Sequence, residues 1–120
     1  FNFPVIEDDA ARFENLVAVE LLRAVETWND CGWGKFSLHY LRNKEKQEVD
    51  FLIADNNRPF LMAETKLSDD VPATGLSDFQ QFLNIPAVQL VKKEGVKKVY
   101  RNGKNDILVV TAHRWLSTLP

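Results

Sequence analysis

The stretch from Gln47 to Lys66, QEVDFLIADNNRPFLMAETK, decides the predicted fold. Two apolar runs, residues 49–54 and 60–63, flank a segment of Asp, Asn and Pro residues that favours a turn. The pattern predicts a β-hairpin, with strands over residues 48–54 and 60–66 and a turn over residues 55–59. Pairing of these two strands would bring Asp50 and Glu64 near one another.

The charged residues of this hairpin allow two interpretations. Glu64 and Lys66 share one face, because side chains alternate along a strand, and with Asp50 they form a plausible divalent-metal site. Alternatively, they lie on a solvated face as exposed ion pairs worth about 0–1 kcal/mol each. Both acids interrupt nearly continuous apolar runs, which are typical of strands covered on both faces. An acid in that position needs a partner or a metal, so the surroundings favour the metal site.

Length and composition are those of an ordinary globular domain. The 120 residues fit one domain with a buried core, and the net charge of −2 neither indicates nor excludes nucleic acid as a partner. No apolar run is long enough to span a bilayer, so we expect no membrane association. Cys31 is the only cysteine, which excludes an intrachain disulfide and agrees with a cytoplasmic location. Because the chain begins with Phe1 and not Met, we expect it to be a fragment of a longer protein.

A helix is predicted over residues 10–28, with Asp8 or Asp9 as its N-cap. Its apolar residues fill one broad arc, and Glu14 falls inside that arc. Two interpretations of Glu14 stay open. Either the acid faces the hairpin acids, or it lies near the helix start, where its charge suits the macrodipole and still reaches water.

The remaining elements are predicted from short apolar runs and turn residues. The predicted strands cover residues 35–42, 87–91, 99–100 and 107–111, a short helix runs from residue 74 or 77 to residue 84, where Pro86 ends it, and a helical turn closes the chain over residues 112–119. His39 is interpreted as a half-buried histidine, because no second histidine or cysteine stands at metal-binding spacing. The order predicts an α/β (α+β) fold with a central mixed sheet flanked by helices, α-β-β-β-α-β plus a C-terminal extension.

Candidate nucleic-acid contacts come from two basic clusters, residues 42–46 and 92–101. Each is either a solvated face or a set of phosphate contacts. Arg42 and Lys44 are the candidates in the first cluster. Gln81 is either ordinary helix surface or a group that reaches a bound phosphate.

The motif residues resemble the restriction-endonuclease-like (PD-(D/E)xK) nuclease superfamily. The matching signature is Asp50, then Glu64-Thr65-Lys66, with the acid Glu14 on the preceding helix. More narrowly, FENLV at 13–17, YLR at 40–42 and EVDFLI at 48–53 are similar to a C-terminal domain of unknown function found on bacterial and archaeal AAA-type ATPases. This resemblance covers about residues 12–116. The sequence departs from the superfamily motif at Val49, because the motif has a proline directly before the aspartate that corresponds to Asp50.

The resemblance implies a restriction-endonuclease-like core and a function. The chain, residues 1–120, would be a single nuclease-like domain at the C-terminal end of a larger ATPase, and only the upstream domain would bind ATP. Asp50, Glu64 and the backbone carbonyl of Thr65 would bind Mg²⁺ or Mn²⁺, with Glu14 added directly or through water. Lys66 would orient or activate the attacking water, so the implied catalytic residues are Lys66, Asp50 and Glu64.

Three functions remain open on this basis. The first is a Mg²⁺-dependent domain that hydrolyses phosphodiester bonds in DNA. The second is a catalytically inactive nuclease-like domain that serves the ATPase as a DNA- or protein-binding module. The third is a structural domain whose acids form ion pairs only. Since a fold does not imply a function, the arrangement of the site residues has to discriminate among them.

Overall fold

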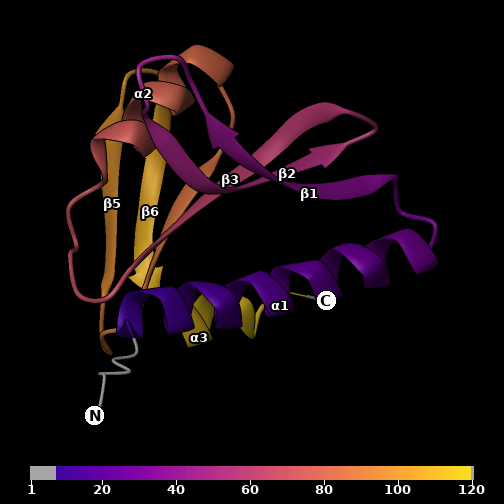
Figure 1. The fold of residues 1–120 in the computed structure, drawn as a ribbon, viewed down its shortest axis with the longest axis horizontal. Coiled ribbons are helices and arrows are strands. Elements are labelled where there is room, and N and C mark those ends of the chain that lie inside the picture. The colour runs from indigo at the N-terminus through magenta and orange to yellow at the C-terminus, as the bar shows by residue number, and fades with distance from the viewer. Residues whose placement is uncertain (1–7, 120) are drawn as a thin grey trace, which may run out of the picture.

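The computed structural model describes residues 8–119, in which a six-stranded mixed sheet has helices on both faces (Figure 1). The elements in chain order are α1 (Asp9–Asp30), β1 (Phe36–Arg42), β2 (Glu48–Asp55), β3 (Arg58–Lys66), α2 (Thr74–Leu83), β4 (Ala87–Val91), β5 (Lys97–Asn102), β6 (Asn105–Thr111) and α3 (Ala112–Leu116). The predicted fold class is confirmed. The domain expected over residues 1–120 also includes residues 1–7 and 120, which lie outside the described residues.

The strands follow the order β1-β2-β3-β4-β6-β5. β1, β2 and β3 pair antiparallel, β3, β4 and β6 pair parallel, and β5 pairs antiparallel with β6. Every residue of β4 is buried, as expected for a strand covered on both faces in the parallel part of a sheet. The prediction of a buried-type strand over residues 87–91 is confirmed at both ends.

The helices divide into two layers. α1 and α3 lie side by side on one face of the sheet, and α2 lies on the other (Figure 1). Val17 and Leu21 of α1 are completely buried and pack with Phe51, Val88 and other residues of the first core cluster. Leu76 of α2 belongs to a second cluster on the opposite face. The sheet is therefore buried on both faces, and its strands present side chains alternately to the two clusters.

The first helix begins as predicted and ends later than predicted. Asp8 is the N-cap, since its Oδ1 accepts a hydrogen bond from the Ala10 N–H at 3.1 Å. The helix continues past Trp28 to Asp30, and Gly32 follows with a φ of +76°. The apolar pattern did not predict this last part of the helix, because the two residues after Trp28 are polar.

The hairpin turn is tighter than predicted. Asp55 belongs to β2 and Arg58 begins β3, so the turn consists of Asn56 and Asn57, with φ values of 53° and 67°. Two consecutive residues with positive φ are what a tight hairpin turn requires, and Asn tolerates that conformation. Pro59 lies within β3, where it is accommodated by a register shift and by the absence of β4 beside this end of the strand.

The C-terminal part contains more strand than predicted. β5 runs over six residues, whereas two were predicted. The sequence pattern missed the others because lysines and an arginine interrupt it. Charge on such an edge strand discourages pairing with other chains. The closing helix α3 ends at Leu116. α2 ends because Asn84 adopts a left-handed conformation with φ 59°, two residues before Pro86.

His39 is exposed and not half-buried. Its Nε2 lies 2.7 Å from Ser37 Oγ on the same edge strand. The predicted alternation along β1 is broken by a register shift between His39 and Leu41, which also leaves Tyr40 exposed.

None of the helices in residues 8–119 combines the length and the apolar character needed to cross a membrane.

Candidate functional site

Asp50 and Glu64 lie where β2 and β3 stop pairing. The ladder between these strands runs from Asp55 and Arg58 to Phe51 and Ala63. Beyond it, the Asp50 N–H donates to Glu64 Oε1 at 3.0 Å. At this point, which we call the fork between β2 and β3, a side-chain carboxylate replaces a backbone carbonyl as the hydrogen-bond acceptor. The predicted proximity of the two acids is confirmed.

Thr65 holds Asp50 from the other side of the fork. Its backbone N–H and its hydroxyl both donate to Asp50 Oδ2, at 2.9 and 2.8 Å. The Asp50 carboxylate is therefore fixed by two hydrogen bonds from one residue. The sequence prediction gave Thr65 a role only through its backbone carbonyl, and that role stays a prediction.

A β-bulge lies at Asp50. In the pairing of β1 with β2, His39 is opposite Leu52 and Leu41 is opposite Val49, so β2 has one extra residue between these pairs. Such a bulge changes the direction of side chains and is common beside functional sites. Accordingly, Val49 packs in the cluster on the α2 side, although regular alternation would place it on the same side as Phe51.

Glu64 is buried, with only 8% of its surface exposed. Burial, followed by the negative charge of Asp50, raises the pKa of Glu64 to about 7, although the hydrogen bond from the Asp50 N–H and the ammonium of Lys66 oppose this shift. The ionised form of Glu64 is thus costly, because burial removes water and Lys66 offsets only part of the negative charge. The site therefore has the electrostatic character of one that a cation would stabilise.

Lys66 lies beside Glu64, as the spacing of two residues along a strand predicted. Its Nζ is 3.9 Å from Glu64 Oε2, and 37% of its side chain is exposed. An ion pair of this length at partial exposure contributes little to stability. The ammonium can therefore reach a ligand at the fork without breaking a strong contact.

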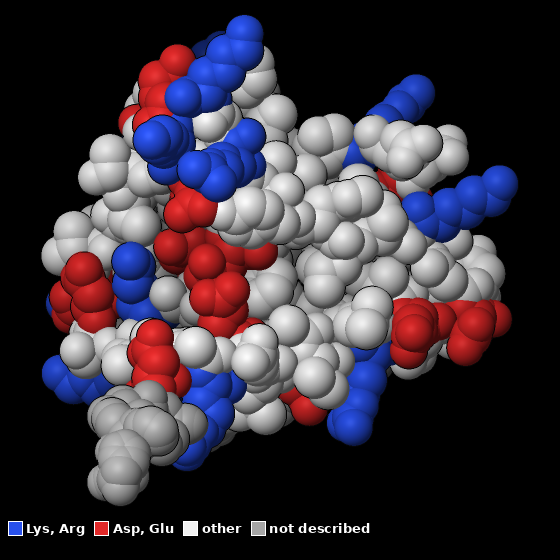
Figure 2. Space-filling view, in the orientation of Figure 1, with Lys and Arg blue, Asp and Glu red and all other residues white. Residues whose placement is uncertain are grey.

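Glu14 is half-buried on α1 and lies within electrostatic range of the same acids. Burial raises the pKa of Glu14, and the charges of Asp50 and Glu48 raise it further. Figure 2 shows a group of acidic side chains between α1 and the strands above it, with lysines and arginines around the group. Within residues 8–119, however, no three His, Cys, Asp or Glu side chains converge closely enough to hold one metal ion. Participation of Glu14 through water stays a prediction.

The predicted nucleic-acid residues do not form one group. Arg42 at the end of β1 and Lys44 in the following turn are both exposed. Gln81 on α2 donates from Nε2 to Asn102 Oδ1 at 2.8 Å. Asn102 belongs to β5, the edge strand opposite β1, so the amide of Gln81 is bonded at the other edge of the sheet from Arg42.

Sequence reasoning missed two residues close to the acids. The hydroxyl of Tyr40 donates to the carboxylate of Glu48, whose charge also acts on Glu14. Gln89 is fully buried on β4, directly opposite Glu64 in the parallel ladder. Its position as the one polar residue in the run AVQLV was the available signal.

Gln89 fixes the segment that follows β3. Its Oε1 accepts from the Ala73 N–H at 2.9 Å, and its Nε2 donates to the carbonyls of Asp69 and Val71 at 3.1 and 2.9 Å. All three of these hydrogen bonds join the buried amide to the connection between β3 and α2. It therefore positions the polypeptide just after Lys66.

Fold and site together define an α+β protein with two carboxylates and a lysine at the fork of a mixed sheet. The chain belongs to the family described as a domain of unknown function, DUF4143, which matches residues 10–114. No curated protein matches the chain.

One similar solved structure is the refined half-complex from the tetradecameric assembly of Thermococcus gammatolerans McrB AAA+ hexamers with bound McrC. A chain of that assembly aligns with a TM-score of 0.63 and 13% sequence identity, over 87% of this chain. At that identity the likeness establishes the fold alone. The chain spans 28% of the length of the chain it matches. Neither comparison names the PD-(D/E)xK superfamily, so that membership stays a prediction.

Proposed function

We propose that this domain is a Mg²⁺- or Mn²⁺-dependent phosphodiesterase acting on DNA, and that it works with an AAA-type ATPase domain. The observation that carries the proposal is the meeting of Asp50 and Glu64 at the fork of β2 and β3, with Lys66 Nζ 3.9 Å from Glu64. Two acids that share a site, one of them with a raised pKa, are typical of a functional site and unusual for a solvated face.

The residues at the fork fit a hard divalent cation. Asp50 accepts from the Thr65 N–H and hydroxyl on Oδ2, and Glu64 accepts from the Asp50 N–H on Oε1. The second oxygen of each carboxylate takes no hydrogen bond from residues 8–119. These two oxygens, with the backbone carbonyl of Thr65, would supply the oxygen ligands that Mg²⁺ prefers, and Glu14 would act through water. A cation held there would supply Lewis-acid activation of water and neutralise charge on the phosphate.

The residues of the chain have separate tasks in this proposal. Thr65 keeps the Asp50 carboxylate in one orientation through two hydrogen bonds. Glu64, with its pKa raised to about 7, releases its proton when positive charge arrives. Lys66 contributes a partly exposed ammonium that stabilises negative charge developing on a phosphate.

The ATPase partnership rests on the structural likeness. The matched chain is part of an assembly of AAA+ hexamers with bound McrC, and this chain corresponds to 28% of it. We therefore propose that the domain belongs to a larger protein in which another domain binds ATP.

A cleavage assay tests the proposal. The chain is incubated with labelled single- and double-stranded DNA, with Mg²⁺, with Mn²⁺ and with a chelator. Metal-dependent cleavage is expected in the wild type and should be lost in Lys66→Ala and Glu64→Gln. Lys97→Ala is the matched control, because Lys97 is an exposed lysine of β5, at the sheet edge farthest from β1. Cleavage that is equal in wild type and Lys66→Ala would contradict the assigned role.

A second candidate is a catalytically inactive module that binds DNA or protein for the ATPase. The observation that favours it is that no three acidic or other ligating side chains converge within residues 8–119. In that case Asp50 and Glu64 would serve only as acceptors for backbone N–H groups and the Thr65 hydroxyl at the fork. DNA binding that is independent of metal, with no cleavage under any condition, would support this candidate over the first.

A further inference from the structure

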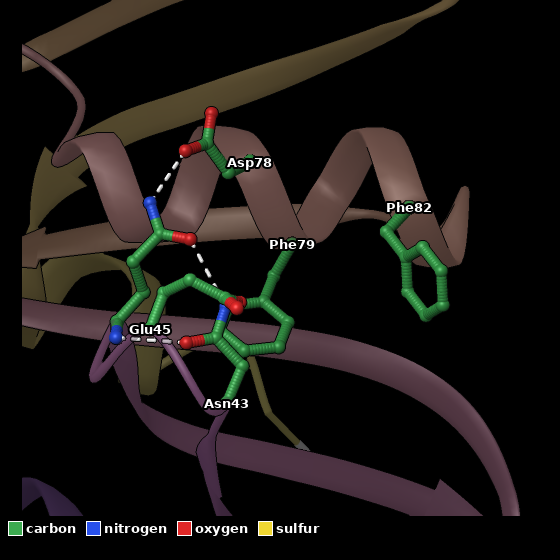
Figure 3. Close-up of a pocket in the computed structure, with 6 residues that line it drawn as sticks. Asn43, Glu45, Asp78, Phe79 and Phe82 are labelled. Atoms are coloured by element: carbon green, nitrogen blue, oxygen red, sulfur yellow. Dashed lines mark hydrogen bonds between the residues drawn. The ribbon is translucent and has the colours of Figure 1, made fainter.

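A pocket of about 340 Å³ lies between the turn after β1 and helix α2 (Figure 3). Its lining residues are Asn43, Glu45, Gln47, Asp78, Phe79 and Phe82. None of these is a residue of the acid site, and the pocket requires a separate explanation.

The polar floor of the pocket is fixed by hydrogen bonds. Asn43 Nδ2 donates to Gln47 Oε1 at 3.0 Å, and the Gln47 N–H donates to Asn43 Oδ1 at 2.9 Å. Gln47 Nε2 then donates to Asp78 Oδ2 at 2.5 Å, which ties the turn to α2 (Figure 3). The amides are therefore occupied by each other, and the pocket is formed before any ligand arrives.

The walls of the pocket combine aromatic rings with negative charge. Phe82 is 83% exposed, more than any other large hydrophobic side chain of residues 8–119, and the half-buried Phe79 lies one turn earlier on α2. Figure 3 shows the side chain of Glu45 beside the ring of Phe79. Glu45 takes part in no hydrogen bond or ion pair within the described chain, and Asp78 supplies a second carboxylate. Lys44 and Lys46 flank Glu45 in sequence but do not line the pocket.

We propose that this pocket docks an arginine side chain of a partner polypeptide. A guanidinium group stacks on aromatic rings and pairs with carboxylates, which matches Phe79, Phe82 and the two acids. The volume lies at the lower end of the range for ligand pockets, so it suits one side chain and not a helix. Phe82 lies at the rim with more surface than a guanidinium covers, and the residues flanking the arginine would bury the rest. This proposal is independent of the acid site.

Titration by nuclear magnetic resonance tests the proposal with capped Gly-Arg-Gly as the probe. The peptide should shift the amide signals of residues 43–47 and 78–82 in the wild-type chain. Phe82→Ala and Glu45→Gln should each weaken its binding about fivefold. Phe60→Ala is the matched control, because Phe60 is another exposed phenylalanine but does not line this pocket, and its affinity should equal that of the wild type.

A lysine peptide, a glutamate peptide and agmatine serve as comparison ligands, to test whether the pocket selects an arginine side chain within a polypeptide. Capped Gly-Lys-Gly should bind more weakly than the arginine peptide, and capped Gly-Glu-Gly should produce no shifts in these segments. Agmatine that binds as tightly as the peptide would overturn the assignment to a polypeptide. An absence of shifts with the arginine peptide, or equal affinity in Phe82→Ala and wild type, would overturn the site itself.

Discussion

Asp50 and Glu64 are joined by a hydrogen bond from the backbone of one to the side chain of the other, with the Asp50 N–H donating to Glu64 Oε1 at 3.0 Å. This bond lies just beyond the last ladder pair of β2 and β3. It holds the Glu64 carboxyl group in place, while burial and then the charge of Asp50 disfavour ionisation of that group. A hydrogen bond therefore fixes the position of the Glu64 carboxyl group, while ionisation of that group costs free energy.

The free energy of unfolding should depend on pH through Glu64. Its pKa is raised from 4.5 to about 7 in the folded chain, so between these values the folded state binds more protons than the unfolded state. Stability should therefore fall as pH rises through this window, by at most about 3 kcal/mol from this group. Urea unfolding of wild type and Glu64→Gln across the window measures the effect.

The comparison with Glu64→Gln isolates this residue from other groups that titrate. Because glutamine stays neutral, the variant should gain stability relative to wild type as the pH rises from about 4.5 to about 7. A difference between the two proteins that stays constant over this range would show that burial of Glu64 carries no electrostatic cost.

Gly75 should be intolerant of substitution, because α2 packs closely against the start of β2. A Cβ at this position would meet the backbone oxygen of Glu48 at 2.7 Å. Gly75→Ala should therefore lose about 1–3 kcal/mol of stability despite the better helix propensity of alanine. Ser77→Ala in the same helix is the control and should change stability by less than about 0.5 kcal/mol. Thermal or urea unfolding measures the stability of both variants. A Gly75→Ala variant more stable than wild type would refute the close contact.

Gln89 should be required for order in the segment between β3 and α2. Gln89→Leu would leave the Ala73 N–H and the carbonyls of Asp69 and Val71 without their partner. The expected loss is at least about 2 kcal/mol, because unpaired buried polar groups are costly. Hydrogen exchange at the Ala73 amide should accelerate as well. Gln81→Leu, which removes one exposed hydrogen bond, should leave that amide protected, and equal exchange in both variants would contradict this role.

The central elements of the fold were predictable because their signals are local. The run AVQLV predicted β4, and two apolar runs around a polar segment predicted the hairpin of β2 and β3. The convergence of Asp50 with Glu64 followed from that hairpin. Glu14 lies near enough to Asp50 and Glu48 for their charges to raise its pKa, while its place in a metal site stays a prediction.

Other features depend on contacts between distant segments and left no local signal. The bulge at Asp50 exists only in relation to β1, and the strand position of Pro59 depends on where β4 begins to pair. β5 is an edge strand whose charges obscure its pattern. The pocket of Phe79 and Phe82 requires a turn and a helix that are separated by two strands in sequence.

Calorimetric titration with Mn²⁺ tests most directly whether the fork of Asp50 and Glu64 is a metal site. The wild-type chain should bind the cation saturably, and its melting temperature should rise with cation concentration by linkage. Asp50→Asn and Glu64→Gln should each lose this binding while remaining folded, and Lys66→Ala should retain it, because Lys66 contributes charge and no ligand. Binding that is absent in the wild type, or equal in wild type and both acid variants, would contradict the metal site and leave the two carboxylates as structural acceptors at the fork.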